Sequence, residues 1–138
     1  MLKKVFVLLA VVFLYLKADM MISPSALPDN IKQFISANFQ ASVGLVQVDG
    51  STYEIYLSDG TELEFDIGGN FKEAKARYAS LNPNILPKHI AAIIKNEYPN
   101  VAIMKIERKI LYYEIKLSNN MELKIDNNGV VLSREFDD

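Results

Sequence analysis

Charged and tyrosine side chains recur at every second position in two parts of this sequence, residues 53–66 and residues 112–126. Alternate residues of a β-strand face the same side, so these side chains would share one face of a sheet. Tyrosine offers a large, rigid surface with one polar group, and it is common where proteins contact each other. The expected chemistry is noncovalent recognition of a partner, with these candidate residues: Glu54, Tyr56, Glu62, Glu64, Tyr112, Glu114, Lys116 and Lys124.

The simpler interpretation of the same pattern is a solvated outer face, on which Glu and Lys form cross-strand ion pairs. The two segments differ in charge, however. Glu54, Glu62 and Glu64 make the first face acidic, whereas Lys116 and Lys124 make the second face mixed. This divergence favours recognition of a partner over a purely solvating role.

No set of residues supports catalysis, so we expect a protein that is not an enzyme and has no catalytic residues. His89 is the single histidine, and its spacing places no carboxylate beside it to form a general base. The sequence has no Cys, which removes thiol nucleophiles and the His/Cys clusters that transition metals need. We therefore expect no cofactor and no resident metal.

Calcium is the alternative ligand that the acidic residues allow. Asp59, Glu62 and Asp66 are close in the sequence, and calcium takes many oxygen ligands. Strand alternation around a tight turn does not bring these carboxylates together, however, and the spacing of an EF-hand is absent. A calcium-responsive structural or sensor protein is the alternative function.

The first 18 residues have the composition of an export signal. Lys3 and Lys4 precede an apolar run over residues 5–16, which is short for a membrane span, and cleavage could leave Asp19 as the first residue. The alternative is an uncleaved anchor, in which case the protein would touch the membrane only through this segment. In both cases we expect the folded part to lie in the periplasm.

The net charge argues against nucleic acid as a partner. The whole chain has a formal net charge of −2, and residues 1–18 contain three lysines and no acid, which leaves about −5 for the rest. Phosphate binding needs a basic face. A protein or peptide of the cell envelope is the partner that we expect.

One hairpin pattern occurs twice in the chain. Residues 53–66 and 113–126, aligned with an offset of 60, are identical at eight of fourteen positions. In each copy, two alternating runs flank a turn sequence, Asp59-Gly60 or Asn119-Asn120, which can supply the positive backbone dihedrals of a tight two-residue turn. The pattern predicts a duplicated antiparallel hairpin.

A helix is predicted before each hairpin. Pro28 and Pro87 each follow a leucine and occupy the first-turn position where proline is tolerated. A narrow apolar stripe, which suits packing against a sheet, follows each proline: Ile31, Phe34, Ile35 and Phe39, then Ile90, Ile93, Ile94 and Tyr98.

Together these patterns predict an α+β fold of two tandem repeats, each a helix followed by a four-stranded antiparallel sheet, with the helices packed on one face of the sheet. The expected organisation is a signal peptide over residues 1–18, a linker over 19–26, a first repeat over 27–80 and a second repeat over 81–138. The sequence leaves open whether the two repeats share one sheet.

The sequence resembles the PepSY-like, β-lactamase-inhibitor-like family of periplasmic proteins over about residues 26–136. Four features carry the resemblance: the helix starts Leu27-Pro28 and Leu86-Pro87, the Tyr-Glu-Ile-x-Leu strands that begin at Tyr53 and Tyr113, the turns that follow those strands, and the pairs Asp66…Gly69 and Asp126…Gly129.

The resemblance implies secretion to the periplasm and a binding role, since related PepSY domains restrain proteases and the inhibitor that gives the name blocks β-lactamases. That inhibitor depends on disulfides, which this chain cannot form. Some members are labelled calcium-regulated, which matches the alternative above. We expect an exported, non-catalytic module that docks a protein or peptide of the cell envelope, with inhibition of a protease or other enzyme as one form of that role.

Overall fold

The computed structural model describes residues 19–137, and the predicted signal peptide over residues 1–18 lies outside them. No helix within the described residues is long and apolar enough to span a membrane. The helices are η1 (Pro24–Ala26), α2 (Asp29–Asn38), η2 (Pro83–Ile85) and α3 (Lys88–Glu97), where η marks a 3₁₀ helix. The strands are β1 (Met20–Ile22), β2 (Val43–Asp49), β3 (Thr52–Leu57), β4 (Glu62–Asp66), β5 (Phe71–Lys75), β6 (Ile103–Arg108), β7 (Tyr112–Leu117), β8 (Met121–Asp126) and β9 (Val131–Phe136).

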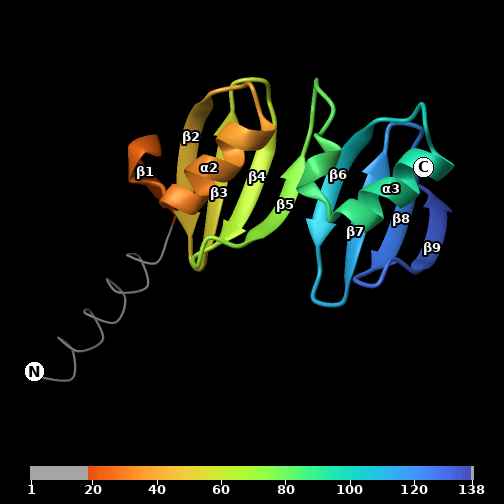
Figure 1. Cartoon of the computed structure of the whole chain (residues 1–138). Helices are drawn as coiled ribbons and strands as arrows, with labels where there is room; N and C mark the ends of the chain where they lie inside the picture. Colours follow the sequence, from red (N-terminus) through yellow and green to blue (C-terminus); the bar gives the residue numbers. More distant parts are fainter. Residues whose placement is uncertain (1–18, 138) are drawn as a thin grey trace, which may run out of the picture.

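The described strands form one sheet, in which they pair in sequence order from β1 to β9 (Figure 1). Every pairing is antiparallel. The predicted fold of two tandem helix-plus-four-stranded repeats is therefore wrong, because the structure has a single nine-stranded sheet with two α-helices. The physical reason is that backbone N–H and C=O groups at the edge of β5 form hydrogen bonds with β6. This pairing joins the strands of the two predicted repeats into one sheet.

The segment predicted as a linker, residues 19–26, contains a strand. Met20, Met21 and Ile22 form β1, which pairs with β2, and Ile22 packs against the hydrophobic core. β1 pairs with β2 in the same way as β5 pairs with β6. The edge of β2, which would otherwise expose unpaired backbone groups, is therefore covered by β1. A strand this short has too little alternation to be recognised from sequence.

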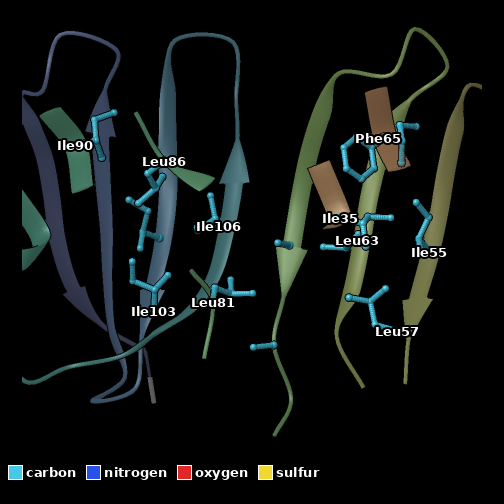
Figure 2. Close-up of a cluster of buried hydrophobic side chains, with 14 of the residues drawn as sticks. Ile35, Ile55, Leu57, Leu63, Phe65, Leu81, Leu86, Ile90, Ile103 and Ile106 are labelled. Carbon is cyan, nitrogen blue, oxygen red and sulfur yellow. The ribbon is translucent and has the colours of Figure 1, made fainter. Parts of the chain in front are cut away.

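Both α-helices lie on the same side of the sheet (Figure 1). The apolar stripes point inward, since Ile31 and Ile35 of α2 and Ile90 and Ile94 of α3 are buried. Alternate strand residues meet them to form the core, part of which Figure 2 shows: Ile55, Leu57, Leu63, Phe65, Ile103 and Ile106. The opposite side of the sheet is covered by no element of residues 19–137.

The two corresponding hairpin turns each contain one residue with a positive φ, Gly60 at 85° and Asn120 at 65°. The backbone N–H of Gly60 donates to the Leu57 carbonyl, and the N–H of Leu57 donates to the Thr61 carbonyl. Each turn is therefore a three-residue loop between paired residues, longer than the predicted two-residue turn. A three-residue hairpin loop needs only one positive φ, which glycine or asparagine adopts readily.

The first turn of each α-helix is tied to a distant strand turn. The Asn30 side chain donates to the Gly69 carbonyl at 3.2 Å, and His89 Nε2 donates to the Asn127 carbonyl at 2.9 Å. Gly69 has a φ of +85°, and a Cβ there would run into the Asn30 amide. The lone histidine thus holds α3 against the β8–β9 turn.

We expect Ile106→Ala to lower the free energy of unfolding by about 2–5 kcal/mol, because truncating a fully buried aliphatic side chain leaves a cavity. Ile106 is 0 % exposed and lies opposite Ala74 at the β5–β6 pairing. Urea denaturation followed by circular dichroism measures the change.

Ile110→Ala is the matched control, since Ile110 is 93 % exposed and its loss should change stability by less than about 0.5 kcal/mol. Equal losses for the two variants would contradict the burial described for β6.

Candidate recognition face

The open face is defined here as the side of the sheet away from α2 and α3. All the candidate residues predicted from the sequence lie at open-face positions, because each alternates with buried residues of β3, β4, β7 or β8. The strand register places them in directly opposed pairs: Glu54 with Glu64, Tyr56 with Glu62, Tyr112 with Asp126, Glu114 with Lys124, and Lys116 with Glu122.

The most unusual feature of the open face is a row of glutamates, which we call the glutamate row. It consists of Glu54, Glu64, Glu73, Glu107 and Glu114, one on each strand from β3 to β7 and each directly opposite the next. Neighbouring strands are about 4.8 Å apart, and like charges directly opposite each other destabilise a sheet. The row therefore carries a cost in stability.

Sequence reasoning missed Glu73 and Glu107, which lie opposite each other where β5 pairs with β6. Glu73 lies beside a register shift between β4 and β5, which breaks the simple alternation of its strand. Glu107 comes opposite Glu73 only because β5 pairs with β6, and α3 separates those strands in the chain. No local pattern in the sequence signals this contact.

A shorter row of lysines runs beside the glutamate row. Lys75, Lys105 and Lys116 lie opposite one another on β5, β6 and β7. Lys105 Nζ is 3.4 Å from a Glu73 carboxylate oxygen and 3.7 Å from one of Glu107. Burial alone would lower the pKa of Lys105, but the two carboxylates together raise it above its ordinary value.

The two ends of the glutamate row differ in their electrostatic surroundings: Glu54 and Glu64 lie at the β3–β4 end, and Glu114 lies at the β7 end, closer to the lysines. Burial raises the pKa of Glu54, and repulsion by Asp49 and Asp19 adds to the effect. Burial also raises the pKa of Glu64, reinforced by the opposed Glu73. By contrast, a hydrogen bond with Glu122 and the charges of nearby lysines lower the pKa of Glu114.

A hollow of about 290 Å³ opens on this face. It is lined largely by charged side chains, among them Lys75, Lys105, Glu114, Lys116 and Glu122. A shallow hollow with paired charges can bind complementary groups of a protein surface. It holds no histidine or serine that could act as a general base or nucleophile.

The acidic residues considered for calcium do not converge. Asp59 precedes β4 and accepts a hydrogen bond from the Thr61 backbone N–H at 3.0 Å, whereas Asp66 ends β4 and accepts one from the Asn70 N–H at 2.9 Å. Hydrogen bonds from Asn70 lower the pKa of Asp66. Across residues 19–137, no group of three or more Asp, Glu or His side chains could hold a metal ion.

The fold and the open face define a small antiparallel sheet protein with helices on one side and an uncovered, charged surface on the other. A family model described as "Putative beta-lactamase-inhibitor-like, PepSY-like" matches residues 51–133. The chain belongs to this PepSY-like family. A comparison with curated proteins found none that matches the sequence.

Three solved structures with the same fold come from two Bacteroides species. One, described as a "putative calcium-regulated periplasmic protein" from Bacteroides thetaiotaomicron, is 31 % identical, with a TM-score of 0.79 over 85 % of this chain and 96 % of that chain. A "putative periplasmic protein" from Bacteroides vulgatus is 29 % identical, with the same TM-score and coverage. Another from that species, described as of unknown function, is 27 % identical, with a TM-score of 0.78 over 86 % of this chain and 99 % of that one.

We expect Glu64→Gln to raise the free energy of unfolding at pH 7 by about 0.2–1 kcal/mol, because it removes a charge between two opposed glutamates. The folded-state pKa of Glu64 lies above the ordinary 4.5, so its charge destabilises the fold above that pKa. The gain should vanish as the pH falls below about 4, where the carboxyl is protonated in both states. Urea denaturation at several pH values measures this.

Glu107→Gln is the matched control, since Glu107 lies in the same row but contacts Lys105 and, at 2.6 Å, Lys109. We expect no gain in stability from this change. A gain of equal size for Glu107→Gln would show that Lys105 and Lys109 do not offset the repulsion that Glu107 meets in the row.

Proposed function

We propose that this protein is an exported, non-catalytic binding module that docks a protein or peptide of the cell envelope on its open face. The observation that carries the proposal is the glutamate row, which runs across the side of the sheet that no helix covers. The periplasmic description of the structural neighbours and the basic and apolar start of the chain support export.

The physical argument concerns the cost of the row. A face that served only solubility would gain from opposite charges on neighbouring strands, as Glu114 and Lys124 have. The five glutamates of the row instead place like charges on neighbouring strands. Such local conflicts are typical of functional sites, where binding of a partner offsets the loss of stability. Tyr56 and Tyr112 are half-buried on this face and add rigid contact area.

Inhibition of an enzyme is the finer form of this proposal. The printed description of the family, beta-lactamase-inhibitor-like, supports it. A module that docks on a protease or another envelope enzyme inhibits it when the contact covers the active site. The enzyme that is retained by the protein is therefore the one to assay.

The proposal is tested by capture from a periplasmic extract on the immobilised protein, read by mass spectrometry. We expect a specific envelope protein to be retained by the native chain and to be reduced at least about tenfold by Tyr56→Ala with Tyr112→Ala, since interface tyrosines are frequent energetic centres. Circular dichroism checks that the variant is folded.

Tyr78→Ala is the matched control, because Tyr78 is 78 % exposed in the loop after β5, outside the strands of the open face. It should retain the partner. Equal loss with Tyr78→Ala, or no loss with the double variant, rejects docking on this face.

A calcium-responsive protein is the second candidate function. It is favoured by the neighbour described as calcium-regulated, which is 31 % identical over most of this chain. Binding would have to draw together carboxylates that the structure keeps apart, since no ready cluster exists in residues 19–137.

We expect isothermal titration calorimetry to show no saturable heat at millimolar calcium, because a calcium site needs several converging oxygens. Heat that saturates at one or two ions per chain would favour the calcium-responsive function instead. Magnesium serves as the control for unspecific attraction of divalent cations.

A further inference from the structure

The two halves of the sheet offer an internal comparison. β2, β3 and β4 correspond to β6, β7 and β8 with the same register, so that Leu45 lies opposite Tyr56 as Lys105 lies opposite Lys116. In the same way Glu64 takes the place of Lys124, opposite a glutamate in both halves. Three lysines of the second half thus correspond to Leu45, Tyr56 and Glu64 in the first.

In the second half, the chain supplies its own counter-ions. Lys105 and Lys109 contact Glu107 at 3.7 Å and 2.6 Å, and Lys124 lies directly opposite Glu114. The Lys124 ammonium also lies over the Tyr112 ring, 5.9 Å from its centroid. Glu107 and the Tyr112 ring therefore contact cations of the same chain, and Glu114 has a lysine opposite it, although the Lys124 and Glu114 side chains form no ion pair within 4.0 Å.

In the first half, those counter-ions are missing. β2, β3 and β4, with the turns between them, contain no Lys or Arg and these acids: Asp49, Glu54, Asp59, Glu62, Glu64 and Asp66. Arg77 packs against Gly60 in the turn between β3 and β4, and two lysines stand on the adjacent strand β5. Lys72 donates to the Thr52 hydroxyl at 3.2 Å, and Lys75 lies opposite Glu62 without forming an ion pair within 4.0 Å.

The electrostatics of the first half agree with this absence of cations. Burial, followed by the charges of Asp49, Asp19 and Glu62, raises the pKa of Glu54. Burial, followed by the charges of Glu54, Glu62 and Glu64, raises the pKa of the Tyr56 phenol. The first half thus presents an aromatic ring inside a negative field.

We infer that the open face of β2, β3 and β4 binds a lysine- or arginine-rich segment of a partner protein. Its cationic side chains would lie where Lys105, Lys116 and Lys124 lie in the other half, between opposed carboxylates. The Tyr56 ring offers a cation–π surface, and Leu45 can cover the aliphatic stem of a lysine or arginine. The inference rests on the proposed docking function and adds the chemistry of the partner.

The test uses the full-length protein and two synthetic probes, a peptide of alternating Lys and Thr and its counterpart of alternating Glu and Thr. We expect the lysine peptide to bind in a salt-dependent manner and the glutamate peptide not to bind. Amide chemical-shift changes in NMR spectra should fall on β2, β3 and β4 (Figure 1) and spare β6, β7 and β8.

Glu64→Lys installs the residue of the second half and should weaken binding of the lysine peptide about tenfold. Asp29→Lys is the control with the same change of net charge, because Asp29 is exposed on α2, on the other side of the sheet. It should weaken binding by less than about twofold, since solvent and salt screen distant charges.

The reciprocal variant tests a gain of binding. Lys116→Tyr with Lys124→Glu gives β7 and β8 the residues of the first half, so a second peptide should bind and shift the amides of these strands. Because the variant gains a function, misfolding cannot imitate the expected result.

Three results would overturn the inference: equal binding of both peptides, shifts centred on β6, β7 and β8 in the native protein, or unchanged binding by Glu64→Lys. If one of these results occurs while the Tyr56→Ala, Tyr112→Ala variant still fails to capture the envelope protein, docking on the open face stands and only the cationic chemistry of the partner is rejected. If, in addition, capture does not depend on Tyr56 and Tyr112, the open face is not a docking site.

Discussion

The pairing of β5 with β6 is the interaction on which the rest of the molecule depends. It places Glu73, Ala74 and Lys75 opposite Glu107, Ile106 and Lys105, and it continues through the hydrogen bond from the Ala76 N–H to the Met104 carbonyl at 2.9 Å. Without this contact the sheet would be two smaller sheets, each with an exposed edge. The same contact makes the glutamate row continuous, so the architecture and the candidate site have one origin.

The individual elements could be predicted from the sequence, whereas their assembly could not. Alternation around Ile55 and Leu63 indicated the strands of the first hairpin, and the stripe that begins at Ile31 indicated a helix, because burial imposes a period on local sequence. The β5–β6 pairing joins segments on either side of α3, and such a contact leaves no local period. Glu73 and Glu107 were missed for that reason, although the other three glutamates lay in recognisable strands.

The two halves share a core and differ on the open face, which separates the demands of folding from those of binding. Ile55 and Ile115 are both 0 % exposed at corresponding positions, and Leu63 and Leu123 are both 1 % exposed. Close packing allows little change there. Tyr56 and Lys116, one residue along, meet no such constraint, so the charge of the face can change while the backbone stays the same.

The order of the strands also bears on how the protein forms. Each strand pairs with its neighbour in the chain, and most connections are tight turns, so most pairs form with little loss of chain entropy. The longest connection between paired strands, from Lys75 to Ile103, contains α3, which shortens the effective distance between its ends. Antiparallel sheets of this size usually fold slowly because distant segments must meet. Here a surface that spans nine strands can be assembled mostly by local steps, and the two steps that are not local, β1 on β2 and β5 on β6, each bring together strands on either side of an α-helix.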